Sequence, residues 1–381
     1  MLVKKCNNPV WKPYILMVMS LSSGGANLKS KSHFHVLDGL RGVAALAVVV
    51  FHFMEWIYPV EENFIGYGFL AVDFFFCLSG FVIAYAYDSR ISEMGIRAFF
   101  TSRLIRLHPL VVAGAVLGLI GLLVDPFGDH AATISTTSLA LIFVGSLLMI
   151  PLPIMEARAF NLFSLNAPGW SLFWEYIANI LYAFVLVRLP RKVLGVMLLA
   201  SAAGIVWVGH SSGHLLGGWN GDTFFHGGIR MAYSFLAGLL IYRSGWIINN
   251  KLGYVVLTMM LAAAFMVPEF AKGWLTEVLI VLVYFPLIVA MGAGSVSSGA
   301  VQKICVFMGN ISYPLYMTHY VGIWWFGNYF ITKHPSPEML PWIIGAGTVA
   351  MVFFAWLVMV AYDIPIRNFL SRKRNEKMKG S

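Results

Sequence analysis

The stretch that decides the fold is Leu37-Asp38-Gly39-Leu40-Arg41-Gly42, which continues into the apolar run Val43 to Phe53 with His52 inside it. Such a run predicts a membrane-spanning helix. Charged or ionisable residues inside a span are costly, and they usually have a function or a partner. Ten residues separate Arg41 from His52, so eleven steps of about 100° return them to nearly one helix face, roughly 16 Å apart along the axis. We expect both side chains to point into one cavity of a helix bundle.

The composition indicates an all-α, polytopic membrane protein. The 381 residues are 59% hydrophobic and 11% charged, with a mean hydropathy of +0.77, whereas a soluble chain has about a quarter charged residues. The net charge of +9 is concentrated at the termini and in short loops, where it sets membrane topology, so no nucleic-acid partner is expected. The three cysteines lie far apart, without metal-ligand or disulfide spacing, and no metal or bound cofactor is predicted.

Apolar runs predict the number of crossings. They occur near residues 39–58, 66–87, 107–124, 135–153, 171–188, 193–209, 227–243, 252–268, 274–292, 310–331 and 340–361. The basic tail and the lysine-bearing N-terminus are both expected in the cytoplasm, which requires an even number of crossings. We therefore predict about ten spanning helices and one re-entrant or broken segment within 107–170, where Pro151 and Pro153 interrupt the pattern.

Three regions follow from this topology. Residues 1–35 are predicted to form an interfacial cytoplasmic segment rather than a signal peptide, because their apolar run is too short to span. Residues 36–363 form the transmembrane domain, and residues 364–381 form a basic cytoplasmic tail. The loop near Gly209–His226 is expected outside the cell, either resting against a sugar or simply solvated.

His52 and Asp73 are the first candidate catalytic pair. They lie on the first two spans at similar distances from the connecting loop, so antiparallel helices place them at similar depth. A carboxylate beside a histidine fixes its tautomer and stabilises the imidazolium, which is the arrangement of a general base. The alternative is a packed histidine satisfied by a backbone carbonyl.

Arg103 and Arg106 share a helix face because they are three residues apart, and Arg97 precedes them. Forked guanidiniums grip phosphate groups well, so these three are candidate donor-binding residues. The alternative is a positive-inside anchor.

Polar groups inside later spans are the candidate substrate-binding residues. Trp170 and Glu175 open one span, and Glu175 could bind a hydroxyl group, assist proton transfer or pair with an arginine. Tyr313 and His319 lie in another span near Pro314, which frees a backbone carbonyl and kinks the helix. His319 is expected to be structural or to contact substrate.

Together these segments resemble the acyltransferase 3 family of integral membrane acyltransferases. The matching pieces, in chain order, are Asp38-Gly39-Leu40-Arg41-Gly42 with Arg-x10-His ending at His52, Val72-Asp73-Phe74-Phe75-Phe76-Cys77-Leu78-Ser79-Gly80-Phe81, Arg103-x-x-Arg106-Leu107-His108-Pro109, Trp170-Ser171-Leu172-Phe173-Trp174-Glu175, and Ser312-Tyr313-Pro314-Leu315-Tyr316 with His319. His108 stands where the family often has Tyr or Phe. The resemblance implies about ten spanning helices, with Arg41 and His52 as the essential pair and the Arg-x-x-Arg loop linked to the acyl donor.

The activity implied by the resemblance is transfer of an acyl group, most often acetyl, from acyl-CoA as co-substrate to a hydroxyl of a carbohydrate or glycolipid acceptor. The expected setting is the inner membrane of a bacterium, with the lipid bilayer as partner and a homo-oligomer compatible with the sequence. An extracytoplasmic hydrolase-like domain, which some members carry, is expected to be absent. His52 would act as general base or as transient acyl carrier.

Two other classes of membrane protein would explain some of the polar residues within the apolar runs. A proton-coupled transporter also uses intramembrane His, Asp, Glu and Arg, but no internal repeat of the transporter type is found. A membrane scaffold without chemistry would not need buried charge. The acceptor, the acyl chain length and the oligomeric state do not follow from the sequence.

Overall fold

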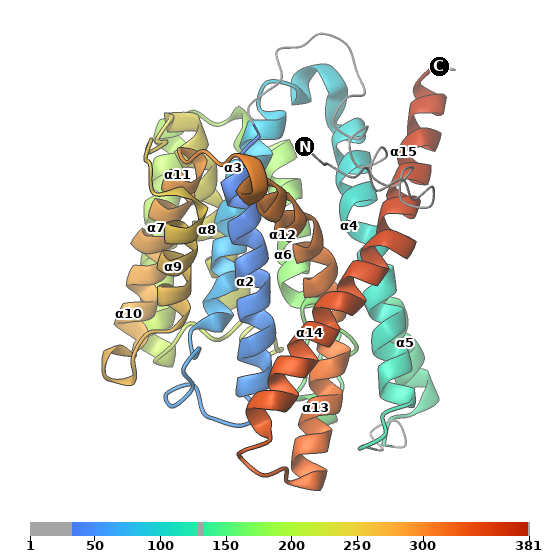
Figure 1. The fold of residues 1–381 in the computed structure, drawn as a ribbon. Coiled ribbons are helices and arrows are strands. Elements are labelled where there is room, and N and C mark those ends of the chain that lie inside the picture. Colours follow the sequence, from blue (N-terminus) through green and yellow to red (C-terminus); the bar gives the residue numbers. More distant parts are fainter. Residues whose placement is uncertain (1–32, 129–132, 380–381) are drawn as a thin grey trace, which may run out of the picture. The chain divides into compact units, whose positions relative to one another are not determined.

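The computed structural model describes residues 33–128 and 133–379, and the chain divides into two units, residues 1–33 and 34–381. Nearly all of the segment predicted for residues 1–35 therefore lies outside the described residues. In the second unit the chain forms helices joined by loops, and an isolated β-bridge joins Asn161 to Asn220. The predicted all-α architecture is confirmed for the described residues (Figure 1).

Each of the eleven apolar runs falls on helix. In chain order the helices are α2 (His35–Met54), η1 (Gly68–Leu70), α3 (Ala71–Tyr87), α4 (Ile91–Leu123), α5 (Thr136–Leu148), η2 (Glu156–Arg158), α6 (Gly169–Phe184), η3 (Leu186–Arg188), α7 (Arg191–Ser212), α8 (Phe224–Ser244), α9 (Gly253–Phe265), η4 (Glu269–Ala271), α10 (Trp274–Leu279), η5 (Ile280–Tyr284), α11 (Phe285–Ala293), α12 (Gly299–Thr318), α13 (Tyr320–Lys333), α14 (Leu340–Val358), η6 (Met359–Asp363) and α15 (Ile364–Lys379). Among the described residues, 7 helices are long and apolar enough to cross a membrane. The total of about ten crossings stays a prediction.

The region 107–170 contains the irregular backbone that the charge pattern predicts. Helix α5 has 13 residues, about 20 Å at 1.5 Å per residue, which is short of the roughly 30 Å hydrocarbon core. It ends at Met149 in the left-handed conformation, with φ 56°, and no α-helix forms again before Gly169. Pro151 and Pro153 lie in this stretch. A re-entrant course for it stays a prediction.

Glycines allow the central helices to approach closely. A Cβ atom at Gly80 of α3 would lie 2.0 Å from the carbonyl oxygen of Phe235 on α8, and one at Gly238 would lie 1.8 Å from that of Cys77. On the other side of the bundle, a Cβ at Gly42 of α2 would meet the backbone of Met308 on α12 at 2.6 Å. Small residues drive such packing in membranes because the backbones gain van der Waals contact. Of these helices, α2, α3 and α12 line the candidate site, and α8 packs against α3.

The run predicted over 310–331 is two helices instead of one. Pro314 lies inside α12, which ends at Thr318, and α13 begins at Tyr320. His319 is therefore the junction residue. It is 1% exposed.

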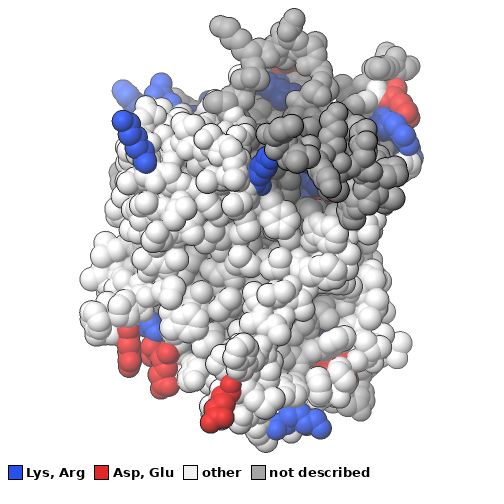
Figure 2. Space-filling view, viewed as in Figure 1, with Lys and Arg blue, Asp and Glu red and all other residues white. Residues whose placement is uncertain are grey.

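Charged residues mark the two ends of the bundle. At the end where α3 stops, Arg243 binds Asp88 with Nε and Oδ2 2.7 Å apart and donates to the carbonyl of Leu186. We call this the basic end and the other the far end. Figure 2 shows Lys and Arg mainly along the upper edge and acidic residues mainly along the lower edge, with an uncharged band between. At the far end, Lys272 donates to the carbonyls of Val60 and Asn63, and burial lowers the pKa of its amine.

Candidate active site

A cavity of about 120 Å³ opens among α2, α3, α4, α6 and α12. Five residues singled out from the sequence line it: Arg41, Arg103, Arg106, Glu175 and Tyr313. The hydroxyl groups of Ser79, Ser171, Ser312 and Tyr316 complete its polar lining. Segments as far apart in the chain as those of Arg41 and Tyr316 thus meet at one cavity inside the bundle.

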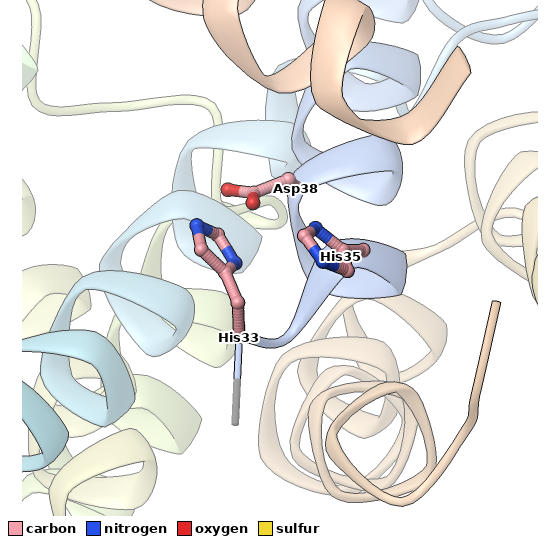
Figure 3. A group of neighbouring side chains, drawn as sticks. All are labelled: His33, His35 and Asp38. Carbon is pink, nitrogen blue, oxygen red and sulfur yellow. The ribbon is translucent and has the colours of Figure 1, made fainter. Parts of the chain in front are cut away.

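Arg41 is fixed by the helix opposite it. Its Nε donates to Oγ of Ser312 at 2.9 Å, and its Nη2 donates to the carbonyl of Gly309 at 2.7 Å. Asp38, beside His35 on the first turn of α2 (Figure 3), lies 3.4 Å from the same Nη2. These contacts join α2 to α12 and hold the guanidinium at the cavity wall.

Glu175 pairs with one of the two arginines of the Arg-x-x-Arg motif. Nη2 of Arg103 lies 2.8 Å from Oε1 of Glu175, which also accepts a hydrogen bond from Oγ of Ser79 at 3.2 Å. Of the three roles left open for Glu175, the arginine pair is the one observed. Tyr313 donates to the carbonyl of Leu107 at 2.7 Å.

Arg106 has no hydrogen-bond or ion-pair partner within the described part of the chain, although it lines the cavity. The wall therefore carries three guanidiniums against one carboxylate. Such a surplus of forked, permanently charged donors suits an anion, and phosphate oxygens match their geometry.

Five of the predicted site residues lie outside this cavity, namely His52, Asp73, Arg97, Trp170 and His319. The expectation that Arg41 and His52 point into one cavity is therefore wrong, and so is the expectation that Arg97 lines one site with Arg103 and Arg106. Trp170 is 8% exposed and packs 5.4 Å from the guanidinium of Arg230. Its ring is covered by Arg230 and does not face the cavity.

The expected pairing of His52 with Asp73 is wrong. Asp73 binds Arg230 of α8 instead, with Nη2 and Oδ2 2.5 Å apart and Nε within 3.2 Å of both carboxylate oxygens. The two side chains are 0% and 1% exposed. His52 and Asp73 were expected at the same depth in the membrane, but similar depth does not make two side chains neighbours. The side chain of Asp73 points toward α8, where it meets Arg230.

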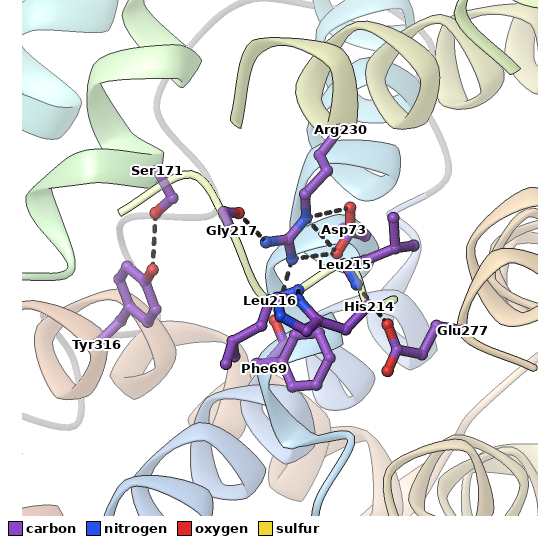
Figure 4. Close-up of polar contacts among 10 residues, drawn as sticks. All are labelled: Phe69, Asp73, Ser171, His214, Leu215, Leu216, Gly217, Arg230, Glu277 and Tyr316. Atoms are coloured by element: carbon purple, nitrogen blue, oxygen red, sulfur yellow. Dashed lines mark hydrogen bonds and ion pairs between the residues drawn. The ribbon is translucent and has the colours of Figure 1, made fainter. Parts of the chain in front are cut away.

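The Asp73–Arg230 pair also holds the loop after α7. Nη1 of Arg230 donates to the carbonyl of Gly217 at 2.9 Å, and the backbone N–H of Leu215 donates to Glu277 at 2.5 Å (Figure 4). Leu215 is 0% exposed. This part of the predicted external loop therefore packs into the protein, unlike a solvated loop.

His52 has a different carboxylate partner. Its Nδ1 lies 2.6 Å from Oε1 of Glu55, one turn later on the same helix. A donor bond from Nδ1–H to that carboxylate leaves the lone pair on Nε2, the tautomer that a general base needs. The ring stacks on His319 at 5.4 Å and meets Tyr320 edge-on at 5.3 Å.

Aromatic side chains connect the cavity to His52, which does not itself line the cavity. Tyr316 lies at the wall, where its hydroxyl shares a 2.7 Å hydrogen bond with Ser171. Its ring lies 6.0 Å from that of His319, which in turn stacks on His52. The arginine cavity and the His52–Glu55 pair are thus neighbouring parts of one site.

The comparison with known families agrees with this arrangement. A family model described as an acyltransferase domain, that of acyltransferase 3, matches residues 34–360. The chain belongs to the acyltransferase 3 family, and its members are acyltransferases. The match covers α2 through α14 and so includes every residue of the site.

Relatives are found among bacterial proteins. "Protein 2 in picA locus" of Rhizobium radiobacter is 37% identical over 183 residues, which cover 44% of this chain and 91% of that protein. "Putative O-acetyltransferase SACOL0978" of Staphylococcus aureus (strain COL) is 31% identical over 97 residues, 25% of this chain and 15% of that protein. The match thus spans only a small part of the staphylococcal relative. No solved structure matches the chain.

Sequence reasoning missed the charged partners of two predicted site residues, Arg230 for Asp73 and Glu55 for His52. Arg230 carried the same signal as Arg41, an arginine inside an apolar run. Glu55 stands three residues after His52, a spacing that puts both on one helix face. Both could have been found from the sequence.

Proposed function

We propose that this protein is an O-acyltransferase that moves an acyl group from acyl-CoA to a hydroxyl of a carbohydrate or glycolipid acceptor. The name of its staphylococcal relative supports acetyl as that group. One observation carries the proposal. Arg41, Arg103 and Arg106 line one cavity, and the His52–Glu55 pair lies further along the same helix as Arg41. Acyl transfer from a phosphate-bearing donor needs a site that binds the phosphates and a general base near the thioester. Helix α2 contributes to both, through Arg41 and His52.

The donor is proposed to bind from the basic end. Lys and Arg concentrate at the cytoplasmic side of membrane proteins, so the basic end is assigned to the cytoplasm, with both termini there, in the inner membrane of a bacterium. The phosphates of CoA would meet Arg103 and Arg106, and the unpartnered guanidinium of Arg106 is free to bind them bidentately. Arg41 would meet the donor deeper in the bundle.

The reaction is proposed to occur at His52. Nε2 takes the proton of the acceptor hydroxyl while its oxygen attacks the thioester carbonyl, and Glu55 stabilises the imidazolium that forms. The tetrahedral intermediate then collapses, the C–S bond breaks, and the thiolate of CoA takes the proton back from His52. General-base catalysis of this kind contributes about 10²–10⁴ in rate.

The acyl group is proposed to pass Tyr316 and His319 on its way to His52, because the contacts of these rings link the cavity wall to the histidine. In a two-step variant Nε2 of His52 attacks the thioester carbonyl, the C–S bond breaks, and the CoA thiolate leaves with the proton that His52 loses from Nδ1 through Glu55. The acceptor hydroxyl then attacks this acyl-imidazole, the C–N bond breaks, and the hydroxyl proton returns to His52 through Glu55, so no further co-reactant is needed. It separates the donor step from the acceptor step.

The test is release of CoA from acetyl-CoA by purified protein in nanodiscs. Wild type is compared with His52→Ala, with Arg103→Ala/Arg106→Ala, and with Arg97→Ala as a matched control outside the cavity. We expect release by wild type and by Arg97→Ala, none by His52→Ala, and weaker donor binding in the double variant.

Full release by a folded His52→Ala variant would overturn the mechanism. Absence of CoA binding and release in a folded wild type would overturn the acyl-CoA donor. Retention of tight CoA binding in Arg103→Ala/Arg106→Ala would remove the cavity from the donor site.

A further inference from the structure

Buried hydrogen-bond donors without acceptors gather beside His52 at the far end. Arg158 is 4% exposed, and its Nε has no partner among the described residues. Nε1 of Trp324 is also a buried donor without a described partner. Nε2 of His319 has no described partner either, but Nδ1 of this ring donates to the carbonyl of Leu315, so Nε2 carries the lone pair and accepts. Buried polar groups are nearly always hydrogen-bonded, so orphaned ones call for an explanation such as a bound molecule. Two orphaned donors and one orphaned acceptor in one neighbourhood indicate a ligand with hydroxyl groups, which both accept and donate.

These donors belong to one continuous cluster that reaches the proposed base. The guanidinium of Arg158 lies 4.5 Å from the centre of the Trp324 ring. Trp324 contacts Trp56 at 5.4 Å and Tyr320 at 6.2 Å, and Tyr320 meets His52 at 5.3 Å. His52, Trp56, Tyr320 and Trp324 are each partly exposed. The cluster is therefore open to a ligand from outside the protein core.

The charge balance of the cluster favours a neutral ligand. Arg158 supplies one positive charge, and its electrostatic neighbours include Asp125. Glu55, which binds His52, is an electrostatic neighbour of Tyr320. Asp125 balances the charge of Arg158, and Glu55 adds a negative charge near Tyr320, so the cluster has no surplus positive charge for an anion, unlike the arginine cavity.

We infer that Arg158, Trp324, Tyr320 and Trp56 form the acceptor subsite, and that it binds a neutral, polyhydroxylated ring, a sugar. This inference rests on the proposed function and adds to it which residues hold the acceptor. Sugar hydroxyls accept hydrogen bonds from Nε of Arg158 and Nε1 of Trp324, and the aromatic rings supply apolar surface for the sugar ring. The reacting hydroxyl then lies near Nε2 of His52.

Adjacent tryptophans provide a matched pair of variants. Trp325 is next in the chain, but its Nε1 already donates to the carbonyl of Gly121 at 2.9 Å. Trp324→Phe and Trp325→Phe remove the same N–H group and keep an aromatic ring. Trp324→Phe removes an N–H group that has no hydrogen-bond partner among the described residues. Trp325→Phe removes an N–H group that is hydrogen-bonded within the protein.

The experiment measures acetyl transfer from radiolabelled acetyl-CoA by the full chain in nanodiscs. The probes are methyl glycosides of glucose, galactose, mannose, rhamnose and N-acetylglucosamine, with n-butanol as a plain alcohol. We expect at least one glycoside to be acetylated well in preference to butanol. Its KM should rise about 5-fold to 10-fold in Trp324→Phe, the loss of one hydrogen bond, and should not rise in Trp325→Phe.

Three results would overturn the subsite: no glycoside is acetylated, butanol serves as well as the glycosides, or the KM of the glycoside is the same in Trp324→Phe and wild type. CoA binding by wild type without any acceptor is measured in parallel. Its presence alongside any of these three results rejects the subsite and leaves the donor site standing, whereas its absence rejects the proposed function itself.

Discussion

The carboxylate of Asp73 and the guanidinium of Arg230 form a buried ion pair between α3 and α8, with Nη2 and Oδ2 2.5 Å apart. Arg230 also donates to the carbonyls of Gly217 and Phe69. All of these groups lie away from the arginine cavity. Asp73 is therefore assigned to holding α3, α8 and the loop after α7 together, and the role of orienting His52 falls to Glu55.

Removing one member of this pair should destabilise the protein. Asp73→Asn leaves the buried guanidinium of Arg230 without its counter-charge, which typically costs about 3–5 kcal/mol. We expect a lower unfolding midpoint in a detergent-denaturant titration, with activity falling in proportion to the folded fraction. The double variant Asp73→Leu/Arg230→Met should regain much of the stability, because apolar replacements of a buried pair are often neutral. An Asp73→Asn variant of normal stability but without activity would instead point to a role in catalysis.

Glu55→Gln should slow transfer without weakening donor binding. The amide keeps the size of the side chain but cannot stabilise the imidazolium of His52, so kcat should fall by about 10-fold or more, yet by less than the roughly 10²–10⁴-fold loss expected for His52→Ala. The KM for acetyl-CoA should stay within about twofold, since Glu55 lies outside the arginine cavity. Glu62→Gln, on the exposed loop after α2, is the control. Equal kcat in Glu55→Gln and wild type would show that the contact with His52 does not serve catalysis.

The two arginines of the Arg-x-x-Arg motif should behave differently when replaced. Arg106→Ala removes a guanidinium that has no described protein partner, so it should weaken CoA binding about 10-fold or more with little change in stability. Arg103→Ala also leaves Glu175 unpaired, since the two lie 2.8 Å apart, and should lower the unfolding midpoint as well. Calorimetric titration with CoA and thermal unfolding of both variants separate the two effects. Similar losses of stability in both would contradict the assignment of Arg106 as a free donor-binding group.

Much of the fold followed from the sequence because the signals are local. Each apolar run falls on helix, and the positions of Arg41 and His52 on α2 follow from helical periodicity alone. Arg103 and Arg106 share the cavity because three residues nearly complete one turn. Periodicity sets which residues of one helix share a face.

The partners across helices could not be obtained in this way. Asp73 and His52 lie at similar depth, but the rotation of α3 about its axis decides which neighbour Asp73 meets. That rotation is set by the close approach of Gly80 to the Phe235 carbonyl, a contact 155 residues away in the chain that no local pattern reports. Periodicity also gave one run over 310–331 and did not report the break at His319.

Tyr316 should control passage of the acyl group from the cavity to His52. It lines the cavity, and its ring leads to His319, which stacks on His52. Tyr316→Phe keeps the ring and loses only the 2.7 Å hydrogen bond to Ser171, so it should cost about 1 kcal/mol of stability and leave a substantial transfer rate. Tyr316→Trp adds bulk at the same place and should block transfer while CoA still binds at the arginines. Single-turnover transfer measured beside CoA affinity distinguishes these effects. If Tyr316→Trp transferred acetyl at the wild-type rate, the acyl group would have to reach His52 by another route, and the connection through Tyr316 and His319 would be only structural.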